Sequence, residues 1–209
     1  AIVVGDGVSY EFAQDIIEKV SKEYTLSKEH QYIFAGLPSE TEHNMSQLYI
    51  DSGTVVKDKQ DREAYLLKQN KDKSIGFIDL EKVNETSDKE HYLICSYKDP
   101  DKLGETYQHK ALKYFDLVAG IFATKIEQLF KNGYQNVYLV TDHGFVLTGI
   151  LDNSDKIEVD FKGIVKISER FIRSENKQKI DTNLLIEKEE DYHSYNHFRF
   201  SKRLGPYNS

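Results

Sequence analysis

The sequence has no tryptophan, a single cysteine and no long apolar run. The lone cysteine, Cys95, excludes an internal disulfide, and its place in the apolar stretch 91–97 favours a buried, unreactive thiol. A transmembrane helix needs about 20 apolar residues, and no stretch approaches that length. No signal peptide is visible either, so we expect a cytoplasmic protein with no membrane partner.

An excess of positive charge is also absent. The chain has 28 Lys and Arg against 35 Asp and Glu, which gives a formal net charge of −7. This balance argues against an extended nucleic-acid patch, because clamping a phosphate backbone requires clustered basic residues. The lysine-rich stretch 57–73 has acidic residues interleaved throughout, which is typical of a solvated face. A short nucleic-acid end held by metal ions is still allowed, since bound cations dominate the local field.

What is present predicts one α/β domain. Apolar runs predict strands at 1–4, 31–37, 75–80, 91–97 and 136–140, and helical spacing predicts helices at 9–24, 62–69 and 108–132. Alternating strands and helices predict a mostly parallel sheet flanked by helices on both faces. From residue 150 the sequence becomes charged and loop-rich, so we expect a core at 1–149 and an accessory or lid region at 150–209. Both ends read as cuts from a longer protein, with the C-terminus truncated.

Polar residues follow several of these predicted strands. Asp6, Thr41, Asp101 and Asp142 would share the carboxyl edge of the sheet, where ligands of such sheets bind. Purely structural interpretations stay open for them. Asp6, between two glycines, and Asp142 can belong to polar turns. Thr41 can simply lie in the first turn of a helix that Ser39 and Glu42 begin as a capping box.

A chemical interpretation combines the same residues. Divalent cations bind carboxylates and imidazoles, and Asp142 and His143 can serve one ion from adjacent positions. The hydroxyl of Thr41, in the first turn of a helix, would lie near exposed amides and the positive dipole end, which favour a phosphoryl oxygen. Beside a divalent cation that hydroxyl would be a nucleophile at neutral pH. His43 follows Thr41 by two positions and is a candidate substrate-binding residue.

Three motifs, in this order, resemble the PglZ domain, a branch of the alkaline-phosphatase superfamily. They are Asp6-Gly7 after the first strand, the segment LPSETE at 37–42, and the segment VTDHGF at 140–145. The resemblance covers most of residues 1–175, including the arginine-containing stretch at 169–173. It implies an alkaline-phosphatase-like fold.

The resemblance also implies a site with two metal ions, of which Zn²⁺ is the expected species. One ion would be surrounded by Asp6, Thr41, Asp142 and His143, with Thr41 as the nucleophile. The other would take Asp101 and Glu105, where the family usually has an Asp-x-x-x-His arrangement, and Asp99 and His109 are nearby alternatives. Arg170 would bind the substrate.

The function that the resemblance implies is a metal-dependent phosphohydrolase or phosphodiesterase. Its partners would be a phosphoester, with nucleotide-derived compounds among the candidates, and other components of a bacterial phage-defence or signalling complex. The alternative is a catalytically inactive PglZ-like scaffold. Glu105 in place of histidine and the lack of the superfamily's His-Gly-Gly segment favour that alternative, since His193 and His197 do not match the segment. A third hypothesis, sulfatase or phosphomutase chemistry, is weakened because a sulfatase needs a Cys/Ser-x-Pro-x-Arg motif.

Overall fold

The computed structural model describes part of the chain in detail. The described residues are 1–26, 32–37, 39–51, 53–84, 90–145, 165–167, 171–177, 179–180, 185–189 and 197–201. The chain divides into two compact units, which we call the N-terminal unit (1–146) and the C-terminal unit (147–209), and each is described by itself. Among the described helices, none combines the length and the apolar character needed to cross a membrane.

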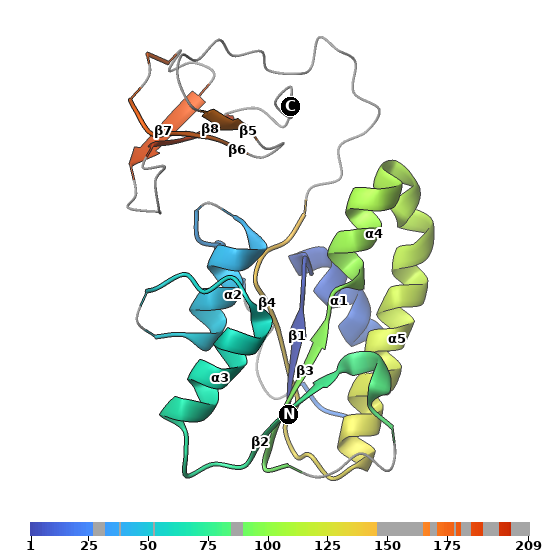
Figure 1. Cartoon of the computed structure of the whole chain (residues 1–209). Coiled ribbons are helices and arrows are strands. Elements are labelled where there is room, and N and C mark those ends of the chain that lie inside the picture. The colour runs from blue at the N-terminus through green and yellow to red at the C-terminus, as the bar shows by residue number, and fades with distance from the viewer. Residues whose placement is uncertain are drawn as a thin grey trace. The chain divides into compact units, whose positions relative to one another are not determined.

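The N-terminal unit is an α/β fold built on a four-stranded, all-parallel sheet (Figure 1). The strands lie in the order β2-β3-β1-β4. Their bounds are β1 Ile2–Gly5, β2 Ile75–Asp79, β3 Tyr92–Tyr97 and β4 Tyr138–Thr141. The predicted parallel sheet is therefore confirmed, with the N-terminal strand in its interior.

The described residues of this unit form five α-helices and two short 3₁₀ turns, η1 and η2. The helices are α1 Tyr10–Lys19, α2 Thr41–Tyr49, α3 Lys59–Gln69, α4 Asp99–Tyr107 and α5 Leu112–Lys131, and the turns are η1 Leu80–Lys82 and η2 Gln108–Ala111. Helix α1 begins after Ser9, whose hydroxyl accepts a hydrogen bond from the Phe12 N–H and so caps the helix. After α5, Gly133 takes the positive φ of 94° that its position requires.

Adjacent residues of β1 belong to different hydrophobic clusters. Val3 packs in a cluster with the apolar faces of α1 and α5, including Phe12 and Phe122. Val4 packs in a second cluster with α2, including Met45. Because side chains alternate along a strand, this division follows directly from the strand geometry. Strand β1 is therefore packed between the two clusters, one on each face of the sheet.

Two sequence predictions near Thr41 are wrong. The sequence predicts a strand at 31–37, but residues 32–37, the described part of it, have no strand structure, and Ile33 and Phe34 are 86% and 92% exposed. Apolar composition alone suggested a strand there, yet none of the described strands pairs with this segment. The capping box is also absent, because the residue that caps α2 is Glu40, one position after Ser39, and its side chain makes no capping hydrogen bond. Thr41 nevertheless lies in the first turn of α2, as predicted.

The predicted long helix at 108–132 is shorter than expected. Helix α5 begins at Leu112, and the preceding residues form η2 and a separate helix, α4, that the sequence patterns did not reveal. Pro100 lies in the first turn of α4, a position that proline tolerates because its missing N–H would be unpaired there anyway. Asp101 is consequently a helical residue rather than part of a loop.

The described part of the C-terminal unit is an antiparallel sheet in the order β5-β6-β8-β7. Its strands are β5 Val165–Ile167, β6 Phe171–Ser174, β7 Leu185–Glu189 and β8 His197–Ser201. The fully buried Arg199 donates to Glu187 over 2.7 Å and also to the Ser174 hydroxyl, so its charge is paired within the sheet. The expected role of residues 150–209 as a lid stays a prediction.

Candidate metal centre

The register of the parallel sheet brings Asp6 and Asp142 together. Gly5 at the end of β1 is the partner of Thr141 at the end of β4, so the residue after each strand leaves the sheet at the same level. Both carboxylates are buried, at 7% and 5% exposure. Sheet pairing alone therefore places two acidic side chains 136 positions apart in sequence at one edge, where parallel sheets bind ligands.

Thr141 fixes the turn that carries Asp142 and His143. Its hydroxyl donates to the His143 carbonyl over 2.7 Å and accepts the Val8 N–H over 3.1 Å. One side chain thus ties the turn after β4 to the turn after β1. The sequence alone did not indicate this role, although a hydroxyl directly before an Asp-His pair could have suggested it.

The Asp142 carboxylate has one satisfied and one unsatisfied oxygen. Oδ1 accepts the Gly7 N–H over 3.2 Å. Oδ2 is buried without a hydrogen-bond partner, although it lies 3.3 Å from His143 Nε2. A buried carboxylate oxygen in that state is costly unless another group compensates it.

Thr41 enters the site from the first residue of α2. Its Oγ1 lies 3.0 Å from His143 Nε2 and 3.3 Å from Asp6 Oδ1, to which it donates. Nε2 of His143 is also 3.7 Å from Asp6 Oδ1, and the side chain of His143 is 1% exposed. The four residues that the resemblance assigned to one ion are therefore neighbours in space.

Asp101 joins this group from the first turn of α4. One ligand atom each from Asp6, Asp101 and His143 lie within 4.8 Å of one another, so these three residues can hold a metal ion. Two carboxylates and an imidazole are ligands that divalent cations of the Zn²⁺ or Mn²⁺ type accept. The unpartnered Asp142 oxygen beside His143 agrees with a site that needs a cation.

The local electrostatics point the same way. The pKa of Asp6 is raised to about 7, chiefly by burial and then by the nearby Asp142 and Asp101, while His143 and the Thr41 hydrogen bond oppose the shift. Burial also raises the pKa of Asp142, against the opposing effects of His143 and the Gly7 N–H. Carboxylates crowded out of water in this way resist ionisation unless positive charge is supplied.

The remaining predicted site residues either make contacts outside the group of Asp6, Asp101 and His143 or lie outside the described residues. His43 lies on α2 and its Nε2 is 2.9 Å from Gln47 Nε2. Asp99 accepts a hydrogen bond from the Tyr97 hydroxyl over 3.1 Å and is not among the three grouped residues. Glu105 lies in α4 but its side chain is outside the described residues, as is that of His109, and Arg170 lies wholly outside them.

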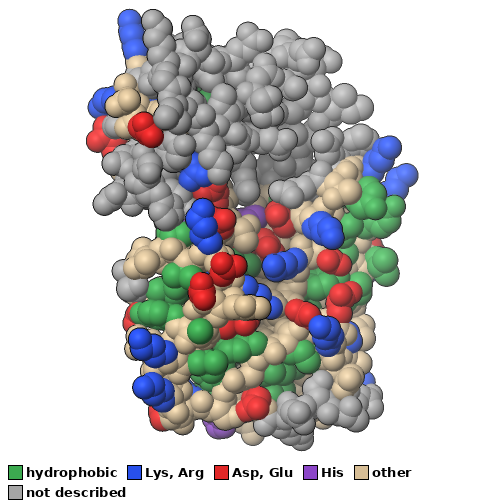
Figure 2. Space-filling view, viewed as in Figure 1, with side chains coloured by type: hydrophobic (Ala, Val, Ile, Leu, Met, Phe, Trp, Pro, Cys, Tyr) green, Lys and Arg blue, Asp and Glu red, His purple; other side chains and the backbone are tan. Residues whose placement is uncertain are grey.

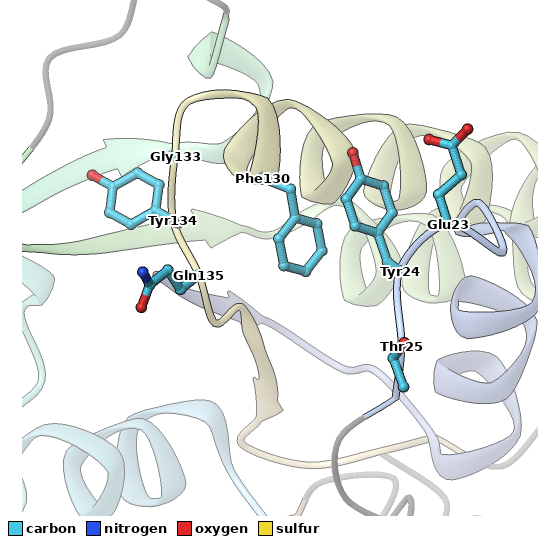
Figure 3. Close-up of a pocket in the computed structure, with 7 residues that line it drawn as sticks. All are labelled: Glu23, Tyr24, Thr25, Phe130, Gly133, Tyr134 and Gln135. Carbon is cyan, nitrogen blue, oxygen red and sulfur yellow. The ribbon is translucent and has the colours of Figure 1, made fainter.

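A surface pocket of the N-terminal unit lies elsewhere. Tyr24 stacks on Phe130 there, with ring centroids 4.3 Å apart, and Figure 3 shows the residues around them. Gly133 to Gln135 line it just before β4 begins, so it lies at the amino end of that strand, away from Asp142. Glu23 is the one acidic residue in its lining. None of the residues of the candidate centre lines this pocket.

Surface charge and the lone thiol add little to the site. On the face shown in Figure 2, acidic and basic side chains of the described residues are interspersed. Cys95 is buried in β3, and burial raises the pKa of its thiol to about 12, as expected for an unreactive cysteine.

Comparison of the chain with protein-family models, with curated proteins and with solved structures gave no match.

Proposed function

We propose that the chain is a PglZ-like metal-dependent phosphohydrolase, acting on phosphodiesters. The observation that carries the proposal is the place of the Thr41 hydroxyl, 3.0 Å from His143 Nε2 and 3.3 Å from Asp6 Oδ1 at the start of a helix. A hydroxyl beside a group that can hold a cation, and beside the amides of a helix N-terminus, has what a nucleophile for phosphoryl transfer requires.

The proposed reaction has two displacements at phosphorus. Thr41 Oγ1 attacks phosphorus and loses its proton, the ester P–O bond breaks, and the departing alkoxide takes up a proton from water. Asp6 accepts the Thr41 hydrogen bond and so orients the hydroxyl, whose proton passes to solvent water. Water then cleaves the Thr41–phosphoryl bond and restores the hydroxyl. A divalent cation held by Asp6, Asp101 and His143 would supply Lewis-acid stabilisation of the developing charge.

Zn²⁺ is the cation we propose for this centre. Mixed oxygen and imidazole ligands support it, as does the resemblance to a zinc-using superfamily. The described ligands account for one ion, and a second ion would draw on Glu105, as the resemblance implies.

An alkaline-phosphatase-like arrangement is the finer architecture that we propose. It is supported by the two separate clusters around Val3 and Val4. It is also supported by Figure 1, where α2 and α3 are drawn on the side of the strands opposite α1, α4 and α5. Helices on both faces follow from that arrangement.

The biological setting is proposed from the resemblance alone. We place the protein in a bacterial phage-defence or signalling complex, in the cytoplasm, with a nucleotide-derived phosphoester as a candidate substrate.

The second candidate function is an inactive scaffold, which Glu105 and the lack of a His-Gly-Gly segment favour. Zinc content separates the two, because a scaffold of this kind would bind no zinc at saturating concentration.

The test is substitution of Thr41 in zinc-loaded protein, with bis(p-nitrophenyl) phosphate as the substrate. Thr41→Ala should lower kcat/KM by at least ~10³-fold, because the nucleophile is lost, whereas Thr41→Ser should retain most activity. Thr54→Ala, an exposed threonine outside the site, is the matched control. Phosphate trapped on Thr41 and detected by peptide mass spectrometry would support the covalent step. Equal activity of the Thr41→Ala and Thr54→Ala proteins would refute the mechanism.

A further inference from the structure

Gly7 lies between the ligands of the candidate centre although it has no functional group of its own. It follows Asp6 directly, and its N–H donates to Asp142 Oδ1 over 3.2 Å. Its φ is 70°, in the left-handed region that residues with a Cβ rarely adopt. Gly7 is therefore linked to two residues of the site: it is the chain neighbour of Asp6, and it is a hydrogen-bond donor to Asp142.

Gly7 also determines how closely Asp101 can approach. A Cβ at Gly7 would lie 2.9 Å from Asp101 Cβ and 3.1 Å from both its Cα and its Oδ1. Two of these atoms belong to the backbone or to the first carbon of the side chain, so rotation of a flexible side-chain tip would not relieve the contact. The start of α4, which carries Asp101, would have to move away from Asp6 and His143.

Gly53 provides an internal comparison. Its φ is 72°, almost the same as that of Gly7, but a Cβ there would meet nothing within 4 Å. An alanine at either position would suffer similar backbone strain. The alanine at position 7 would in addition collide with a ligand of the candidate centre.

We propose that Gly7 is a positioning residue for the cation site. The space left by its missing side chain allows Asp101 to reach Asp6 and His143, and its N–H fixes the Asp142 carboxylate. The inference rests on the cation site of the proposed function and does not depend on hydrolysis. It adds to the proposed ligands a residue that is not a ligand, because the turn after β1 determines how closely the ligands approach one another.

The experiment compares Gly7→Ala with Gly53→Ala. Co²⁺ is titrated into each protein, with its visible absorption reporting coordination geometry, and Zn²⁺ binding is measured by calorimetry. Gly7→Ala should weaken Co²⁺ binding by roughly 10–100-fold, the usual cost of losing a group that orients metal ligands, and should alter the Co²⁺ spectrum. Gly53→Ala should leave affinity and spectrum unchanged, although both variants lose thermal stability. Wild-type affinity and spectrum in Gly7→Ala would overturn the inference.

A second variant covers the case in which Gly7→Ala does not fold. Asp101→Gly removes two of the three atoms that the new Cβ would meet. Folding should therefore be recovered in the Gly7→Ala/Asp101→Gly double variant if the collision with Asp101 is the cause, and failure to recover it would overturn the inference.

Wild-type protein that binds Co²⁺ but hydrolyses no phosphoester would refute the proposed hydrolase alone. An active enzyme whose Gly7→Ala variant binds Co²⁺ normally would refute the positioning role alone.

Discussion

At the scale of single residues, the candidate centre concentrates negative charge where water is scarce. Asp6 and Asp142 are both buried, and burial raises the pKa of each. Such an arrangement destabilises a cation-free protein at neutral pH, because ionised carboxylates lose hydration on folding. The same arrangement favours a bound cation, whose charge offsets that loss.

Asp6 makes the stability of the cation-free protein depend on pH. Its pKa is about 7 in the folded protein, above the ordinary value of 3.8, so the folded state retains a proton that the unfolded state has already released. Stability should therefore fall as pH rises from about 4 to about 7 and then level off. The loss is of the order of 4 kcal/mol, since each pKa unit corresponds to about 1.36 kcal/mol. Urea unfolding in EDTA across this pH range measures it.

Asp6→Asn should reduce this pH dependence, leaving the contribution of the raised pKa of Asp142, which has the same sign. The control is Asp116→Asn on α5, where the carboxylate is 85% exposed. A slope in Asp6→Asn as steep as in the Asp116→Asn protein would contradict the assignment.

At the scale of elements, α5 provides the largest helical face of the core. Phe122 is fully buried, and its ring meets that of Tyr97 edge-on with centroids 5.0 Å apart. Phe122→Ala should cost about 3–5 kcal/mol of unfolding free energy, since the lost contacts leave a cavity. Leu117→Ala on the same helix, where the side chain is 64% exposed, should cost less than about 1 kcal/mol. Urea titrations of both variants check the difference, and equal costs would show that α5 does not pack as described.

The elements that sequence patterns predicted well are those with strong periodicity. The apolar run at 136–140 contains most of β4, although Tyr138 is exposed and the next three residues are only partly buried, and the apolar stripe from Phe115 onward is the buried face of α5. Helix α4 was missed because its short, acidic sequence begins with Asp99-Pro100-Asp101, which resembles a turn. The segment 32–37 was misjudged because apolar residues indicate a strand only when another strand pairs with them.

The sequence allowed most residues of the candidate site to be predicted, but it did not allow their arrangement in space to be predicted. Asp6, Asp142 and His143 were identifiable because they directly follow strands of a parallel sheet. Asp101 was expected at the same edge but was assigned to a second ion with Glu105, and its grouping with Asp6 and His143 depends on how α4 approaches Gly7. Contacts of that kind are set by tertiary packing and leave no local pattern.

At the scale of the whole molecule, cation binding should raise stability. A cation that binds only the folded chain adds about 2.7 kcal/mol at a free concentration 100 times its Kd. We expect Zn²⁺ to raise the Tm, EDTA to reverse the rise, and the rise to be larger at pH 8 than at pH 5, because the ligands must lose protons to bind. Differential scanning fluorimetry measures these shifts.

His143→Ala should abolish the Zn²⁺-dependent rise in Tm, because it removes the imidazole of the candidate centre. His91→Ala, which changes an exposed histidine before β3, should retain the rise. A rise that persists in His143→Ala but disappears in His91→Ala would locate the cation elsewhere.

The interior place of β1 has a consequence for how the chain is made. Ile2 pairs with Ile94 on one side and with Tyr138 on the other, so β1 is fully paired only when β4 has been synthesised. A ribosome that adds about 5–20 residues per second needs roughly 7–30 s to deliver both neighbours. Until then β1 has an unpaired edge, although α1 and α2, which pack on Val3 and Val4, have already been synthesised. During that interval the open edge of β1 is a template on which a wrong strand can pair.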